Sequence, residues 1–241
     1  MNGMVLAYAI TISVSLGVGI PVLVRSWRHR DGRLALLGAA VTIDGLEWLA
    51  WALYLFTPAQ DTPLGEGFAI ACRVGVALSV LCMIAFTRVA FRPGGGAARV
   101  FGWILVCALI AGISGSGLAG DWSGARNDLA WVWLEQIAIT LGYGWAALEP
   151  ARYHLLMRRR VKLGLAEPMV ANRFLLWSLY AGLFCLAQLI WNSSLAFYGG
   201  SSALDALNGS FTVCAEMALL LAVFPPAWYA RRVRAAAAPA R

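Results

Sequence analysis

Residues 41–56 read VTIDGLEWLAWALYLF, a stretch that is apolar enough to cross a bilayer and yet carries two carboxylates. Asp44 and Glu47 lie one helical turn apart, and Trp48 and Trp51 fall on the same face of a helix. Ionisable side chains are costly within hydrocarbon, so they are typical of a functional or tightly paired site. The stretch therefore predicts a spanning helix whose polar face is directed into the protein interior.

The whole chain has the composition of a membrane protein. Of its 241 residues, 61% are hydrophobic and 13% are charged, whereas a soluble domain has about 25% charged residues. Windows of roughly 20 apolar residues predict spanning helices. These windows cover residues 4–24, 34–56, 68–89, 100–119, 129–148, 174–197 and 207–229. We therefore expect an all-α bundle of seven transmembrane helices at residues 1–230, with a short basic cytoplasmic tail at residues 231–241.

The basic residues predict the orientation of this bundle. Of the 19 lysines and arginines, 17 fall in the first, third and fifth connections or in the tail, whereas Arg126 is the single one in the opposite connections. Cytoplasmic loops carry such an excess of basic residues. The pattern predicts an N-terminus outside and a C-terminus in the cytoplasm. It also accounts for the net charge of +7 without nucleic acid as a partner.

Polar side chains on five of the predicted helices fall at similar depths, in the outer half of the bilayer, when depth is counted at about 1.5 Å per residue. This shared depth favours one outward-facing pocket. In this interpretation the acids bind the ligand, the arginine balances their charge, and the tryptophans form the walls. The predicted ligand-binding residues are Glu47, Trp48, Trp51, Arg73, Trp131, Glu135, Gln188, Asn192 and Glu216.

A purely structural interpretation of the same residues stays open. Outer tryptophans form interfacial belts in many membrane proteins, and Gln and Asn side chains join helices by hydrogen bonds. Arg73 has three possible partners in a structural ion pair, since Glu47, Glu135 and Glu216 lie at comparable depths.

Charge counting favours a functional pocket. Four intramembrane acids against Arg73 would leave a net charge of −3 if all were ionised. Burial disfavours such charge, so protons or a cation must neutralise it. Carboxylates beside aromatic faces suit a small polar or cationic ligand. Asp44 lies deeper than the other acids, without an obvious cationic partner, and is the candidate for a proton relay.

Several other classes of protein are disfavoured. The histidines, His29 and His154, and the one lysine, Lys162, all fall in predicted cytoplasmic connections. A histidine-ligated zinc or haem centre and a retinal Schiff base inside the bundle are therefore not expected. Nucleotide-binding motifs are absent, and the five cysteines fall within apolar spans as buried hydrophobic residues. We predict no cofactor, no metal and no enzymatic activity.

Residues 164–177, GLAEPMVANRFLLW, resemble a segment of uncharacterised bacterial seven-helix proteins related to sensor input modules. The resemblance implies a multi-pass protein of the bacterial plasma (inner) membrane. A separate signalling protein would then contact the cytoplasmic connection between Glu149 and Arg173, residues 149–173. The alternative for that connection is basic charge facing anionic lipid.

The leading prediction of function is thus a small-ligand sensor or receptor-like protein in the lipid bilayer. One alternative is a proton- or cation-coupled transporter that uses the same acids and needs a path to the cytoplasm through Asp44, Tyr143 and Glu149. Another is a non-catalytic subunit of a larger membrane complex.

Overall fold

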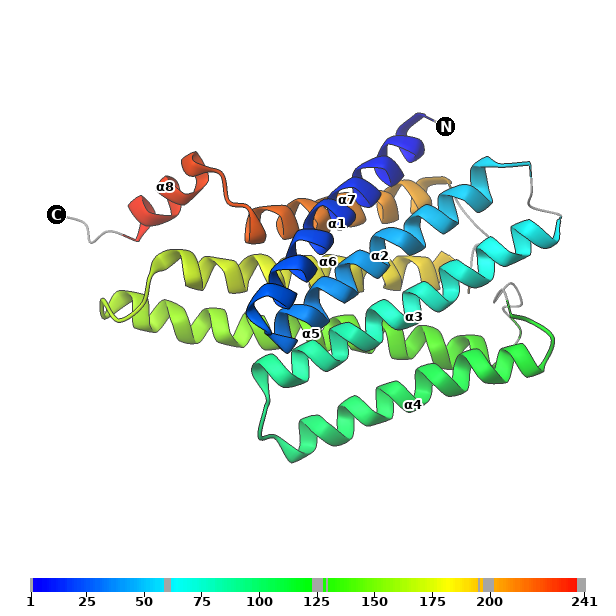
Figure 1. Cartoon of the computed structure of the whole chain (residues 1–241), viewed down its shortest axis with the longest axis horizontal. Helices are drawn as coiled ribbons and strands as arrows, with labels where there is room; N and C mark the ends of the chain where they lie inside the picture. The colour runs from blue at the N-terminus through cyan, green and yellow to red at the C-terminus, as the bar shows by residue number, and fades with distance from the viewer. Residues whose placement is uncertain are drawn as a thin grey trace.

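The computed structural model of the protein describes residues 2–58, 62–122, 128, 130–194, 196 and 202–237, and these residues contain helices and no strand. Seven of the helices have 22 residues or more, and the eighth has 10. In chain order they are α1 (Asn2–His29), α2 (Gly32–Phe56), α3 (Pro63–Phe91), α4 (Gly96–Leu118), α5 (Ala130–Lys162), α6 (Pro168–Ser193), α7 (Ser202–Val223) and α8 (Ala227–Ala236) (Figure 1).

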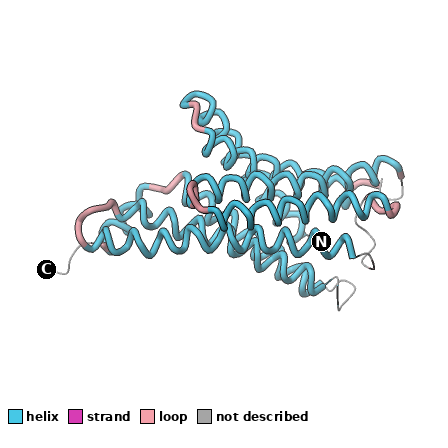
Figure 2. Tube along the Cα trace, turned by 90° about the horizontal axis from the view of Figure 1, so that it is seen from below, coloured by secondary structure: helices cyan, strands magenta, loops and turns pink. Residues whose placement is uncertain are grey.

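Six of the long helices close a ring. Along the chain α1 packs on α2, α2 on α3, α5 on α6 and α6 on α7, while α3 contacts α5 and α7 returns to α1. The fourth helix, α4, lies outside this ring, where it packs mainly on α5 and less on α3 (Figures 1 and 2). Apolar side chains such as Val80, Ile139 and Leu219 fill the middle of the bundle.

Turn chemistry in the sequence accounts for several helix ends. Asp31 Oδ1 caps α2 by accepting hydrogen bonds from Arg33 N at 2.9 Å and Leu34 N at 3.3 Å, a contact that contributes about 1 kcal/mol. At the start of α3, Thr62 caps the helix and proline occupies its first position. Gly164, with φ of +69°, reverses the chain between α5 and α6.

The helices are those of a multi-pass membrane protein. Six of them, α1, α2, α3, α4, α6 and α7, are long and apolar enough to cross a bilayer. Large apolar side chains such as Trp103 and Ile110 on α4 are more than half exposed on the outer surface, as lipid-facing residues are. The fifth expected span, residues 129–148, falls mostly in α5, whose Glu135, Gln136 and glycines lower its hydropathy.

The expected end of one span differs from the structure. The seventh span was expected at residues 207–229, but α7 ends at Val223 because Pro225 and Pro226 lack the amide N–H groups that continue a helix. The expected tail, residues 231–241, begins inside the separate helix α8, and residues 238–241 lie outside the described part. The sixth window, expected to reach residue 197, contains the end of α6 at Ser193, and residue 197 lies outside the described part.

Gly19 lets α1 and α2 approach backbone to backbone. A Cβ at Gly19 would lie 2.6 Å from Thr42 N, whereas a Cβ at Gly17 would meet nothing within 4 Å. We expect Gly19→Ala to destabilise the protein by about 1–3 kcal/mol through overpacking, and Gly17→Ala to leave the free energy of unfolding unchanged or slightly higher. Detergent-induced unfolding of both variants measures this difference. Equal stability of the two variants would contradict the close helix contact.

Candidate functional site

A cavity of about 410 Å³ lies inside the ring of helices, toward the α2–α3 and α6–α7 connections. Small-molecule sites occupy about 300–1,000 Å³, so the cavity has room for a small ligand. All six ring helices contribute to its wall. The lining residues are Tyr8, Glu47, Trp48, Trp51, Tyr54, Ala69, Cys72, Arg73, Val76, Val132, Glu135, Gln136, Ile139, Tyr143, Phe184, Ala187, Gln188, Trp191, Asn208 and Thr212.

Arg73 on α3 is held by a buried ion pair with Glu135 on α5. Its Nε donates to Glu135 Oε2 at 2.9 Å, and its Nη2 contacts the same oxygen. The remaining donors reach Ser116 Oγ on α4 at 2.6 Å and the backbone oxygens of Asp121 and Trp122 at 3.0 and 3.2 Å. Arg73 therefore joins α3, α4, α5 and the chain after α4, and the charge of Glu135 is balanced.

Glu47 on α2 is the acid of the cavity wall that has no ionic partner among the described residues. The residue is 7% exposed, and its Oε2 is buried without a hydrogen-bond partner. Gly75 on α3 makes room for it, since a Cβ there would lie 2.7 Å from Glu47 Cβ. Close packing of α2 on α3 thus holds a carboxyl group in the cavity wall without neutralising it.

Aromatic rings form much of the remaining wall. Tyr8 of α1 contacts Trp48 with ring centroids 5.4 Å apart, and Trp51 stacks on Tyr54 at 5.2 Å. On the opposite side, Tyr143 of α5 stacks on Phe184 of α6 at 5.3 Å. The negative faces of such rings attract cations, so the rings and Glu47 favour the same sign of ligand charge.

Amide side chains join α5 to α6 along the cavity. Gln188 Nε2 donates to Gln136 Oε1 and, at 3.2 Å, to Asn192 Oδ1. Asn192 Nδ2 donates in turn to Thr140 Oγ1 at 3.1 Å. These groups satisfy one another, which is the helix-joining role that amides have in membrane proteins.

A second group of acids lies one helical turn beyond the cavity. Asp44 precedes the lining residue Glu47 on α2, and Glu216 follows the lining residue Thr212 on α7. Both carboxyls meet the hydroxyl of Ser15 on α1. We call Ser15, Asp44 and Glu216 the deep acidic cluster, and all three residues are 0% exposed.

The cavity brings together six of the nine residues that the sequence analysis placed in a ligand site. The six are Glu47, Trp48, Trp51, Arg73, Glu135 and Gln188. Trp131 is not among the lining residues, since it is 45% exposed and packs near Gly115 of α4. Asn192 acts behind the wall, in the amide network, and Glu216 belongs to the deep acidic cluster with Asp44.

Several lining residues were not predicted from the sequence, among them Tyr8, Gln136 and Asn208. Their positions carry a weak signal, because Tyr8 and Ser15 lie seven residues apart on one face of α1, and Asn208, Thr212 and Glu216 follow at intervals of four on α7. The sequence therefore contains a polar stripe on each of these two helices. Ser and Thr side chains in spans commonly form hydrogen bonds with their own backbone, so such a stripe does not by itself indicate a site.

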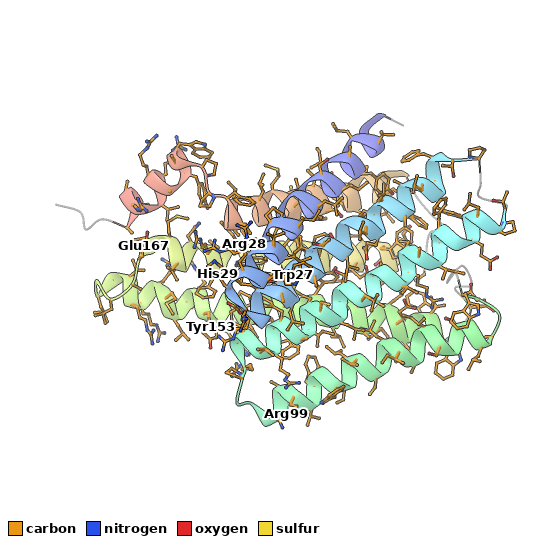
Figure 3. All side chains as sticks on the ribbon, viewed as in Figure 1. Trp27, Arg28, His29, Arg99, Tyr153 and Glu167 are labelled. Atoms are coloured by element: carbon orange, nitrogen blue, oxygen red, sulfur yellow. The ribbon has the colours of Figure 1, made fainter. Side chains whose placement is uncertain are left out.

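The opposite end of the bundle is rich in basic residues, among them Arg28 at the end of α1 and Arg99 near the start of α4 (Figure 3). Glu149 of α5 is buried there and paired with Arg92 Nε at 3.0 Å and Arg152 Nη1 at 3.1 Å. Tyr143, the other residue considered for a path to this end, lines the cavity. The carboxylate of Glu149 is thus used in ion pairs.

No family model matches the sequence, and no curated protein and no solved structure shows significant similarity to it. Within the described part of the chain, no group of three or more His, Cys, Asp or Glu residues has a metal-binding arrangement. The chemistry of the cavity therefore carries the functional argument.

Proposed function

We propose that the protein binds a small organic cation in the cavity and works as a sensor or receptor-like membrane protein. The observation that carries this proposal is Glu47, a buried carboxyl group on the cavity wall with one oxygen that has no partner. A buried carboxylate without a partner is costly, and the positive charge of a bound ammonium ion would offset that cost by Coulomb attraction.

The charge balance of the wall supports a ligand with one positive charge. The described lining residues include two carboxyls, Glu47 and Glu135, and one guanidinium, that of Arg73. Since Arg73 and Glu135 neutralise each other, one negative charge is left when Glu47 is ionised. The aromatic rings around Glu47 then stabilise a cation through their faces, by about 0.5–2 kcal/mol for each contact.

We infer that α5 also spans the membrane, which brings the number of spans to seven, although its hydropathy is lower than that of the other long helices. Its polar residues Glu135 and Gln136 line the cavity, so they are directed into the protein and away from lipid. With seven spans, the basic end of the bundle is cytoplasmic by the positive-inside rule. The cavity then lies in the outer half of the membrane, where an extracellular or periplasmic ligand would enter.

A signal would leave the protein through residues 149–173 in this proposal. The cytoplasmic part of α5 and the turn after it expose Leu155, Leu163 and Leu165 by 59%, 72% and 73%, beside Arg158 and Arg160. A coupled transporter is the weaker candidate, because it needs a proton or ion path past Glu149, whose carboxylate is already held by two arginines.

The test is binding of tetraethylammonium to the purified protein in lipid nanodiscs, compared with triethylmethanol, a neutral molecule of similar shape. We expect saturable binding of the cation and none of the alcohol. Trp51→Leu should weaken binding about 2- to 30-fold, because one cation–π contact is lost. Trp27→Leu is the control, since Trp27 is 79% exposed at the far end of α1.

Binding that is absent for alkylammonium ions of every size, or equal for the cation and the alcohol, would overturn the proposal. Uptake of labelled tetraethylammonium into proteoliposomes separates the two functions, since a sensor gives no flux and a transporter does.

A further inference from the structure

The deep acidic cluster has a hydrogen-bond geometry that two ionised carboxylates cannot satisfy. Ser15 Oγ lies 2.9 Å from Asp44 Oδ2 and 2.9 Å from Glu216 Oε1. A serine hydroxyl has one proton to donate, and an ionised carboxylate is an acceptor only. Ser15 therefore serves one carboxylate as a donor, and the second contact needs a proton on the other carboxyl group.

A separate observation leads to the same requirement. The second oxygen of each carboxyl group, Asp44 Oδ1 and Glu216 Oε2, is buried and has no hydrogen-bond partner. Among the described residues, no arginine, lysine or histidine lies within ion-pairing distance of either acid. Two unpaired anions side by side in a helix bundle would be very costly, so the cluster needs at least one positive charge.

We propose that Ser15, Asp44 and Glu216 form a proton-binding site at the junction of α1, α2 and α7. One carboxyl holds the proton and donates it to Ser15 Oγ, while Ser15 donates its own proton to the other carboxylate. A shift of both protons along this line moves the negative charge from one carboxyl to the other. The bound proton thus bridges three helices, and its loss would leave two anions in contact with one hydroxyl.

The described residues around the cluster supply no positive charge. The titratable groups within electrostatic reach are Glu47 on α2, Cys72 on α3, Tyr143 on α5 and Tyr180 on α6. None of these four is a cation. The indole N–H of Trp48 lies near Asp44 and completes no hydrogen bond. Ser15, Asp44 and Glu216 are not lining residues of the cavity, so the proton-site proposal stands if the cation proposal fails.

Infrared spectroscopy of the full chain in lipid at neutral pH tests the proposal. A protonated carboxyl group gives a carbonyl band well above the carboxylate bands, and a buried one shifts slowly in heavy water. We expect such a band in the unmodified protein, with no ligand added. Of Asp44→Asn and Glu216→Gln, the variant that removes the proton holder should abolish this band, and the other should shift its frequency.

Ser15→Ala provides a second measurement that removes only a hydroxyl group. It should shift the acid band upward because the hydrogen bond to Ser15 Oγ is lost, whereas Ser13→Ala, at an exposed position of the same helix, should not. Labelling aspartate carboxyls with carbon-13 assigns the band in the unmodified chain if the acid variants do not fold. An acid band that keeps its frequency and intensity in Asp44→Asn, Glu216→Gln and Ser15→Ala would overturn the proposal. If the intensity of this band falls as the sodium concentration rises at fixed pH, the site binds a metal cation in place of the proton.

Discussion

Replacing Arg73 with methionine is expected to destabilise the protein by about 3–5 kcal/mol, because it leaves the buried carboxylate of Glu135 without its partner. Glu135 is 1% exposed and Arg73 is 8% exposed, so Glu135 has little contact with water to offset the loss of the guanidinium. The substitution also removes the donors that reach Ser116 on α4 and the backbone of Asp121 and Trp122. The contact between α4 and the ring should weaken with it.

A double-mutant cycle separates the ion pair from packing. Arg73→Met combined with Glu135→Gln should recover a large part of the lost stability, since no unpaired buried charge remains. Arg99→Met, at an exposed arginine of α4, is the control and should change the free energy of unfolding by less than about 0.5 kcal/mol. Detergent-induced unfolding measures Arg73→Met, Glu135→Gln, the double variant and Arg99→Met. A loss for Arg73→Met no larger than that of the control would show that the pair contributes little.

Most of the fold was predictable because hydrocarbon imposes length and composition on each span. The apolar windows located the long helices, whereas the helix starts at Gly32, Pro63 and Pro168 lie before the windows that begin at residues 34, 68 and 174. Hydropathy was misleading at the end of the seventh window. The residues around Pro225 are apolar, but a helix cannot continue through two prolines, and the window method does not weigh backbone hydrogen bonds.

The depth of the site residues along each helix was predictable, but the rotation of each helix about its axis was not. Depth along each helix brought Glu47, Arg73, Glu135 and Gln188 to one level, and these four residues line the cavity. Depth could not choose the partner of Arg73, because three acids lay at comparable levels, and it placed Glu216 in the pocket although its side chain meets Ser15. Those choices depend on how each helix is turned about its axis, which packing decides.

Glu47→Gln is expected to lower the affinity for tetraethylammonium by about 30- to 1,000-fold, equivalent to about 2–4 kcal/mol, because the buried charge that faces the cation is lost. Glutamine has nearly the same shape, so the volume of the cavity should not change. Glu167→Gln is the control, since that acid is exposed and pairs with Arg234 at 3.2 Å. The affinity of this variant for tetraethylammonium should equal that of the unmodified protein.

The same substitution should leave the empty protein at least as stable as before, because an amide is cheaper to bury than an unpaired carboxylate. Glu47 and Glu135 lie at the same depth in the cavity wall, but we expect their substitutions to have different effects. Removing the partner of Glu135 affects folding, and neutralising Glu47 affects binding. If Glu47→Gln unfolds the protein while its ligand affinity per folded molecule is unchanged, Glu47 has a structural role and the cation site lies elsewhere.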